Sequence, residues 1–184
     1  MKPTNKRLTE RFMSDENIQP SLDGHLLQQA AEAYSTTLFR YALSLAHRED
    51  LARDAVQETF LRLAKADQAK VSHHLAPWLF RVCRTRALDL LRKEARMSPA
   101  DDATLARAAD VAPSPASRAE VSDSAAQALR MVETLPENQR EIVRLKFQGG
   151  LSYKEIAEVT ELSVTNVGFL LHTAIKSLRA AMVE

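Results

Sequence analysis

The chain has 184 residues, with 25 basic and 24 acidic side chains and a net charge of +1 at neutral pH. This small net charge argues against a protein that binds nucleic acid over most of its surface. Its single cysteine, Cys83, excludes an internal disulfide and favours a cytoplasmic protein. The N-terminus is polar, and the sequence contains no long apolar run. We therefore expect neither a signal peptide nor insertion into a membrane.

The composition predicts an all-α fold, because Ala, Leu, Arg and Glu are abundant and only four glycines are present. Residues 1–24 lack periodicity, and we interpret them as a flexible N-terminal extension. Residues 97–126 are rich in Ala, Asp, Ser and Pro and carry a net charge of −3, which is typical of a flexible acidic linker. The sequence therefore predicts two small helical domains, 25–96 and 127–184.

The first domain begins with two predicted helices. Residues 25–46 carry apolar side chains at helical spacing. Glu49 and Asp50 then favour the start of a second helix, from Leu51 to about Ala66, because acidic side chains stabilise a helix N-terminus. This helix has an inward apolar stripe and an opposite polar face, and the pattern alone indicates a solvated surface. Residues 67–72 are predicted to form a loop.

A third helix is predicted to begin at Pro77 and to have one apolar and one basic face. From Trp78 to Arg96 it contains six basic and two acidic residues. Such a helix could lie on a membrane, bind an acidic protein or hold a phosphate backbone. Domain 25–96 as a whole has a net charge of +4, so the basic block and the acidic linker are separate in sequence.

The second domain contains the pattern of a helix-turn-helix. A helix begins after Leu135-Pro136 and is expected to end at Gly149-Gly150. Ser152 and Glu155 have the spacing of a capping box for a short helix that ends near Thr160. After a turn, Ser163 is placed to cap a longer helix with apolar residues at helical spacing. The pattern indicates DNA binding, although a generic helical hairpin would also produce it.

Residues typical of catalysis or metal binding do not form recognisable motifs. None of the five histidines forms the helical pair that zinc sites use, and the one cysteine supports no metal cluster. The chain also lacks a glycine-rich phosphate loop and a nucleophile elbow. We therefore expect no enzymatic activity, no metal and no cofactor, and we interpret Cys83 as a small buried residue.

With both halves considered, the sequence resembles an extracytoplasmic-function (group 4) sigma factor of the sigma-70 family. The resemblance covers about residues 25–96 and 127–182. In the first half it is carried by residues 54–60, DAVQETF, with 78–81, WLFR, and 87–92, ALDLLR. In the second half it is carried by Leu135-Pro136, residues 139–141, QRE, 151–157, LSYKEIA, and 167–179.

The resemblance implies a sigma region 2 at residues 25–96, with a core-polymerase surface at Asp54, Gln57, Glu58 and Leu61. It implies a surface for the minus-ten promoter element at Arg81, Arg84, Thr85, Asp89 and Arg92. It further implies a region 4 helix-turn-helix that reads the minus-thirty-five element through Arg140, Lys154, Ser163, Thr165, Asn166, Gly168, Phe169, His172 and Lys176. The implied partners are bacterial RNA polymerase core, promoter DNA and an anti-sigma factor. The chain departs from common family patterns at Thr85 and at Gly168-Phe169-Leu170.

The leading hypothesis is a promoter-specificity factor that acts within the polymerase holoenzyme. One alternative is an autonomous helix-turn-helix regulator, which would bind duplex DNA as a dimer. Another is a helical adaptor that binds polymerase or an anti-sigma factor without DNA readout. The charge distribution predicts that the free chain binds duplex DNA weakly, because the linker and second domain offer few phosphate contacts.

Overall fold

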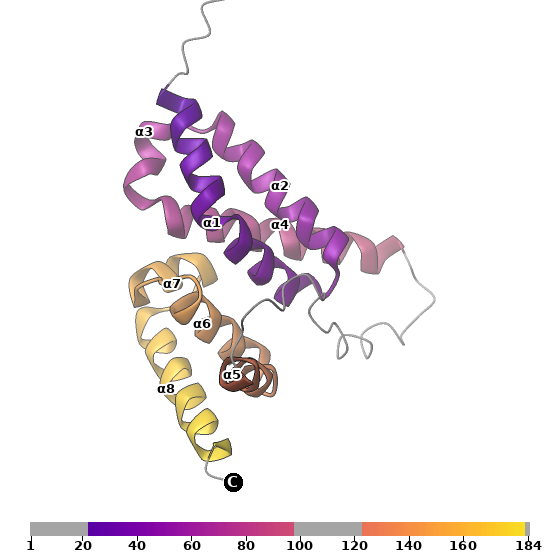
Figure 1. Cartoon of the computed structure of the whole chain (residues 1–184), viewed down its shortest axis with the longest axis vertical. Coiled ribbons are helices and arrows are strands. Elements are labelled where there is room, and N and C mark those ends of the chain that lie inside the picture. The colour runs from indigo at the N-terminus through magenta and orange to yellow at the C-terminus, as the bar shows by residue number, and fades with distance from the viewer. Residues whose placement is uncertain (1–21, 98–122, 183–184) are drawn as a thin grey trace, which may run out of the picture.

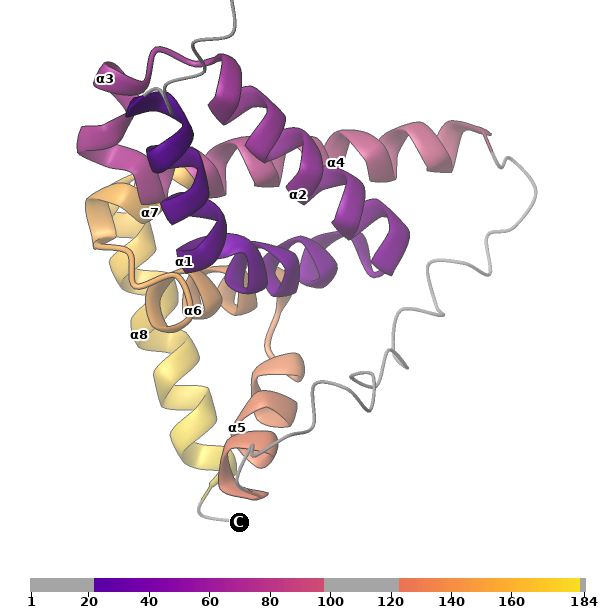
Figure 2. The same cartoon turned by 45° about the horizontal axis from the view of Figure 1, so that its top comes forward.

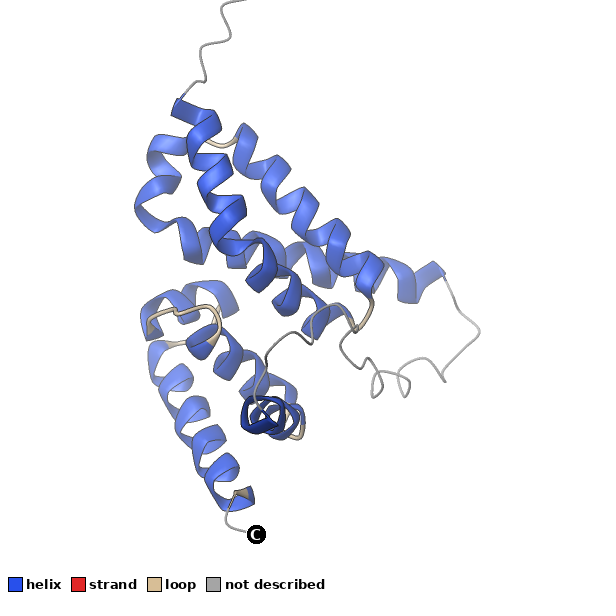
Figure 3. Ribbon diagram, in the orientation of Figure 1, coloured by secondary structure: helices blue, strands red, loops and turns tan. Residues whose placement is uncertain are grey.

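The computed structural model describes residues 22–97 and 123–182. Within these ranges the chain forms helices and no strand (Figure 3), which confirms the predicted all-α class. No helix there is long and apolar enough to cross a membrane. In chain order the elements are α1 (Leu22–Ala46), α2 (Glu49–Lys65), α3 (Gln68–Val71), the 3-10 helix η1 (Ser72–His74), α4 (Leu75–Met97), α5 (Asp123–Glu133), α6 (Glu137–Phe147), α7 (Tyr153–Thr160) and α8 (Val164–Ala181).

Helices α1, α2 and α4 pack against one another and form the body of the first domain (Figure 1). Small residues on α2, such as Ala52 and Ala55, are fully buried and let the helices approach closely. Cys83 is buried on α4, as predicted. The predicted acidic start of α2 is also confirmed, since Glu49 and Asp50 occupy its first turn.

Helices α5 to α8 form the second domain. The predicted caps mark the ends of the helices within it. The Ser152 hydroxyl accepts from the backbone N–H of Glu155, and the Glu155 carboxylate accepts from that of Ser152, which completes the capping box. Gly150 has a φ of 68° where the chain leaves α6. Ser163 caps α8 by accepting from the backbone N–H of Asn166.

Three sequence predictions require correction or restriction. The predicted loop at 67–72 is wrong, because α3 and η1 occupy most of it. Helix α5 begins at Asp123, within the range interpreted as linker, and α1 begins at Leu22, within the range interpreted as an extension. The remaining parts of the predicted extension and linker, residues 1–21 and 98–122, lie outside the described residues.

The two domains are in contact, chiefly where α4 lies against α7 (Figure 2). Their buried side chains belong to one continuous hydrophobic cluster, which includes Leu38 and Phe80 in the first domain and Ile142 and Ile156 in the second. Phe80 also stacks edge-on against Tyr41, with 5.2 Å between ring centroids. The sequence predicted the two domains but not their contact.

Candidate polymerase and promoter interfaces

Helix α2 presents the residues predicted to bind core polymerase on one side. Asp54, Gln57 and Leu61 are exposed there, and Glu58 is partly exposed. Their spacing of three and four residues places them along one stripe, opposite the buried stripe that includes Ala55 and Thr59. Leu61 is 47% exposed, although it is a large apolar side chain. We call these four residues the α2 stripe.

Helix α4 places the predicted minus-ten residues along a single stripe as well. Arg81, Thr85, Asp89 and Arg92 are exposed, and Arg84 is half-buried. The Arg92 guanidinium lies 3.4 Å from the Asp89 carboxylate, and the Thr85 hydroxyl donates to the Arg81 carbonyl. Asp89 therefore neutralises part of the charge near the end of this stripe.

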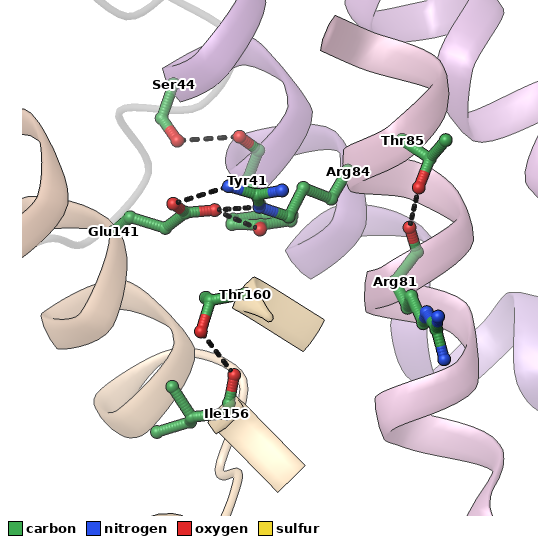
Figure 4. A network of polar contacts seen from close by, with 8 residues as sticks. All are labelled: Tyr41, Ser44, Arg81, Arg84, Thr85, Glu141, Ile156 and Thr160. Atoms are coloured by element: carbon green, nitrogen blue, oxygen red, sulfur yellow. Dashed lines mark hydrogen bonds and ion pairs between the residues drawn. The ribbon is translucent and has the colours of Figure 1, made fainter. Parts of the chain in front are cut away.

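Arg84 binds a carboxylate of the second domain. Its Nε donates to Glu141 Oε1 at 2.8 Å, and its Nη2 donates to Oε2 at 3.4 Å. Glu141 is 9% exposed, and its Oε1 also accepts from the Tyr41 hydroxyl at 2.7 Å. Figure 4 shows Tyr41, Arg84 and Glu141 converging from α1, α4 and α6. We call these three residues the interdomain cluster.

The pKa shifts agree with this geometry. Burial lowers the pKa of Arg84, but the hydrogen bond and the negative charge of Glu141 outweigh that effect, so the pKa is raised overall. Burial, followed by the charge of Glu141, raises the pKa of Tyr41 well above 10.0. Arg84 therefore stays cationic and Tyr41 stays a neutral donor at physiological pH.

Helices α7 and α8 form the predicted helix-turn-helix. Glu161 adopts a left-handed conformation with a φ of 61°, and it reverses the chain between the two helices. Val167, Leu171 and Ala174 are buried on the inner side of α8. The opposite side exposes a stripe of predicted contact residues: Thr165, Asn166, Phe169, His172 and Lys176. Phe169 is 67% exposed, so its ring is accessible from solvent.

The other predicted minus-thirty-five residues have different environments. Lys154 is exposed on α7, and Ser163 is exposed at the cap of α8. Gly168 is partly buried, and a Cβ added there would lie 3.7 Å from the Tyr153 ring. The Arg140 guanidinium donates to the Leu135 carbonyl at 3.0 Å and lies 3.4 Å from the Glu133 carboxylate. Arg140 is therefore occupied within its own domain in this structure.

The sequence did not predict Tyr41 or Glu141 as residues of the site. Their separation of 100 residues leaves no local pattern, and only the packing of α6 beside α1 and α4 brings them together. One signal in the sequence could have identified Glu141: it falls on the buried side of α6, and a buried carboxylate requires a polar or charged partner.

Two family comparisons define the class of the protein. The family model of sigma-70 region 2 matches residues 30–97, and that of sigma-70 region 4 matches residues 125–178. Together they cover most of the chain and correspond to the two structural domains. The chain therefore belongs to the sigma-70 family.

Curated relatives identify the branch of that family. The chain is 29% identical over 159 residues to the ECF RNA polymerase sigma factor SigM of Bacillus subtilis, covering 84% of this chain and 93% of SigM. It is 27% identical over 157 residues to the ECF RNA polymerase sigma factor RpoE of Cereibacter sphaeroides, covering 85% of this chain and 84% of that protein. The protein is an extracytoplasmic-function sigma factor, a DNA-binding subunit that directs bacterial RNA polymerase to promoters during transcription initiation.

Solved structures support the same fold. The sigma factor RpoE of Bartonella quintana, crystallised in complex with the anti-sigma factor NepR, matches 84% of this chain and 95% of its own with a TM-score of 0.65 at 24% identity. CnrH, in complex with the cytosolic domain of CnrY, matches 86% of this chain and 88% of its own with a TM-score of 0.55 at 25% identity.

Proposed function

We propose that three helices divide the contacts of this sigma factor with polymerase and promoter. The α2 stripe binds the clamp-helix coiled coil of the largest polymerase subunit. The arginine-rich side of α4 binds the minus-ten element, and the exposed side of α8 reads the minus-thirty-five element. Residues 25–96 then act as region 2, residues 127–184 act as region 4, and residues 97–126 connect them.

The observation that carries this proposal is the separation of two chemically different stripes on one helical bundle. The α2 stripe combines carboxylates, an amide and an exposed leucine, whereas the α4 stripe is dominated by three arginines. A protein partner can cover Leu61 and accept hydrogen bonds from Gln57, while phosphate groups favour guanidinium groups. The two stripes therefore suit a protein and a nucleic acid, respectively.

The α4 stripe favours single-stranded DNA. Arg81 and Arg92 are exposed, and their guanidinium groups can hold phosphates and stack on unpaired bases. Binding the non-template strand after it separates would stabilise the melted minus-ten element. Melting then follows from differential binding, and we infer that the protein works without catalysing a chemical step.

The exposed side chains of α8 can make both polar and apolar contacts with the edges of bases. Asn166 can pair with an adenine edge, and Phe169 can contact thymine methyl groups in the major groove. Lys154 and the first backbone amides of α8 are available for phosphates. We further propose a cytoplasmic location, where bacterial RNA polymerase works. We also propose regulation by an anti-sigma factor, because the structural relative RpoE of Bartonella quintana was crystallised with the anti-sigma factor NepR.

Run-off transcription with bacterial core polymerase tests the α2 assignment. Core enzyme is supplied with genomic promoters of the source organism and with the wild-type chain or the Gln57→Ala/Glu58→Ala variant. We expect promoter-specific transcripts with the wild type and at least a tenfold loss with the variant, as removal of central interface contacts produces. Gln28→Ala/Glu32→Ala is the matched control, because these residues are exposed on α1 and their side chains hydrogen-bond to each other at 2.9 Å.

Each outcome has a clear meaning. If the α2 variant transcribes as well as the control, the α2 stripe is not the polymerase contact. The Arg81→Ala/Arg92→Ala variant tests α4 separately, with promoter opening measured by the permanganate reactivity of unpaired thymines. If this variant retains full promoter opening, the proposed minus-ten role of α4 is wrong. Loss of opening with retained polymerase binding would support that role.

A further inference from the structure

The first half of α8 carries no charged side chain. From Val164 to Leu171 its sequence is VTNVGFLL, and the lysine and arginine of this helix follow in its second half. In a helix-turn-helix, the N-terminal residues of the second helix contact base edges in the major groove. Arginine and lysine make the commonest specific contact there, with guanine. The base-reading half of α8 therefore lacks the side chains that make this contact.

Phe169 is the most exposed large apolar side chain of that half. It is 67% exposed, compared with 45% for Val164. It shares the outer face of α8 with Thr165, which is exposed four residues earlier, and the adjacent Gly168 adds no side chain beside it. Covering an exposed ring with an apolar group is favourable, because it removes apolar surface from water. In the major groove the C5-methyl of thymine is the apolar group that is available.

Positive side chains lie around the uncharged half of α8. On one side, the Tyr153 ring lies beside the helix, since a Cβ on Gly168 would be 3.7 Å from it. The Lys146 ammonium is held over that ring, 5.6 Å from the centroid. Along the helix, Lys176 is exposed two turns after Phe169. Cations at such flanking positions suit phosphates, which fix the position of the protein on the duplex, whereas base contacts determine its sequence.

We propose that Phe169 selects promoters whose minus-thirty-five element presents thymine methyl groups to α8. The element is then read mainly through apolar contact instead of through hydrogen bonds to guanine. Asn166, exposed three residues before Phe169, adds a contact with adenine, so the preferred element is rich in A·T pairs. This inference rests on the proposed reading of the minus-thirty-five element by α8, and it adds the chemical class of the sequence that is read.

A promoter selection identifies the preferred bases. Holoenzyme assembled from core polymerase and the full chain transcribes a promoter that depends on this chain in the run-off experiment, with its minus-thirty-five element randomised. The templates that are transcribed are then sequenced. We expect enrichment of A·T pairs with thymines at fixed positions. Enrichment of guanines at those positions would overturn the proposal.

Uracil substitution isolates the methyl group, because uracil lacks the C5-methyl of thymine and keeps its hydrogen-bonding groups. Binding of the holoenzyme is compared by competition between promoter duplexes that carry thymine or uracil in the minus-thirty-five element alone. Loss of one buried methyl weakens binding about fourfold, and we expect this factor for each methyl group that is read. Phe169→Ala should bind the two duplexes equally. Phe169→Leu keeps an apolar side chain and should retain part of the preference for thymine.

Phe147→Ala is the matched control. Phe147 is also an exposed phenylalanine of the second domain, at 65% exposure, but it is the last residue of α6 and lies outside α8. Its truncation should leave the ratio of thymine to uracil binding as in the wild type. Circular dichroism verifies that each variant is folded, and Phe169→Leu keeps the test informative if Phe169→Ala is not.

The outcomes separate this inference from the proposed function. If an unrelated sequence in place of the minus-thirty-five element leaves wild-type binding unchanged, α8 does not read that element and its proposed function fails. If the unrelated sequence weakens binding but uracil does not, only the thymine inference is wrong. If Phe169→Ala weakens binding equally on the thymine, uracil and unrelated duplexes, the ring contacts polymerase, and the inference is also overturned.

Discussion

Two glycines in the second domain have opposite steric environments. A Cβ at Gly149 would lie 2.8 Å from the Leu145 carbonyl oxygen and 3.1 Å from the Phe80 ring, and neither neighbour is a flexible side-chain end. At Gly168, within α8, the nearest atom would be 3.7 Å away, which is an ordinary contact. Gly149→Ala should therefore destabilise the chain by about 1–3 kcal/mol. Gly168→Ala should stabilise it by about 0.5–1 kcal/mol, because alanine loses less entropy in a helix. Urea unfolding of both variants checks the contrast, and equal effects would contradict it.

Cys83 provides a second test at the residue scale. Burial raises the pKa of its thiol to about 12, and the side chain is 0% exposed. At pH 8 we therefore expect the native chain to react with a disulfide reagent at least about a hundredfold more slowly than free cysteine, since only the thiolate is nucleophilic. In denaturing urea the rates should be similar. Rapid reaction of the native chain would mean that α4 separates from α1 more readily than the packing indicates.

The capping box makes the start of α7 sensitive to pH. A hydrogen bond from the Ser152 hydroxyl, together with one from its backbone N–H, lowers the pKa of Glu155 below 4.5. A lowered folded-state pKa means that the carboxylate stabilises the fold above its unfolded pKa and loses this contribution as pH falls through the folded value. The stability difference between wild type and Glu155→Gln should therefore shrink between pH 6 and pH 3. Urea midpoints at both pH values test this, and a pH-independent difference would contradict it.

The elements that sequence reasoning located are those with strong local signals. Ser152, Ser163 and Gly150 fix the helix-turn-helix because a cap or a left-handed residue acts on its immediate neighbours. The four-residue α3 is too short to show a helical period, so its range was interpreted as a loop. Helix α5 starts in a stretch rich in Ala, Asp and Ser, where composition did not distinguish a helix from a linker.

The positions of the two stripes on α2 and α4 could be predicted because helical spacing alone determines which residues share a face. The roles of those residues came from the family resemblance, since exposed polar side chains have the same pattern on any solvated helix. The ion pair of Arg84 could not be predicted. Its partner is 57 residues away, on a helix whose place beside α4 depends on packing over the whole chain.

At the scale of the whole molecule, the domain contact couples two small folding units. Small domains bury a limited share of their surface, so the interface adds a large part of the stability of each. The continuous core and the interdomain cluster should therefore make the wild-type chain unfold in a single transition. Glu141→Ala removes the acceptor for both Tyr41 and Arg84, while Arg84, 25% exposed at its side chain, can turn toward water. We expect this variant to lose the coupling between the domains rather than to unfold both.

Scanning calorimetry measures this coupling directly. For the wild type, the calorimetric and van't Hoff enthalpies should agree, as they do for a two-state transition. For Glu141→Ala the calorimetric enthalpy should exceed the van't Hoff value, with one domain unfolding at a lower temperature than the other. Glu158→Ala should behave like the wild type, since its carboxylate is exposed. If Glu141→Ala instead unfolds in one sharp transition at a lower temperature, Glu141 stabilises the fold without controlling the separation of the domains. In that case Arg84 would be released from Glu141 only when the whole chain unfolds.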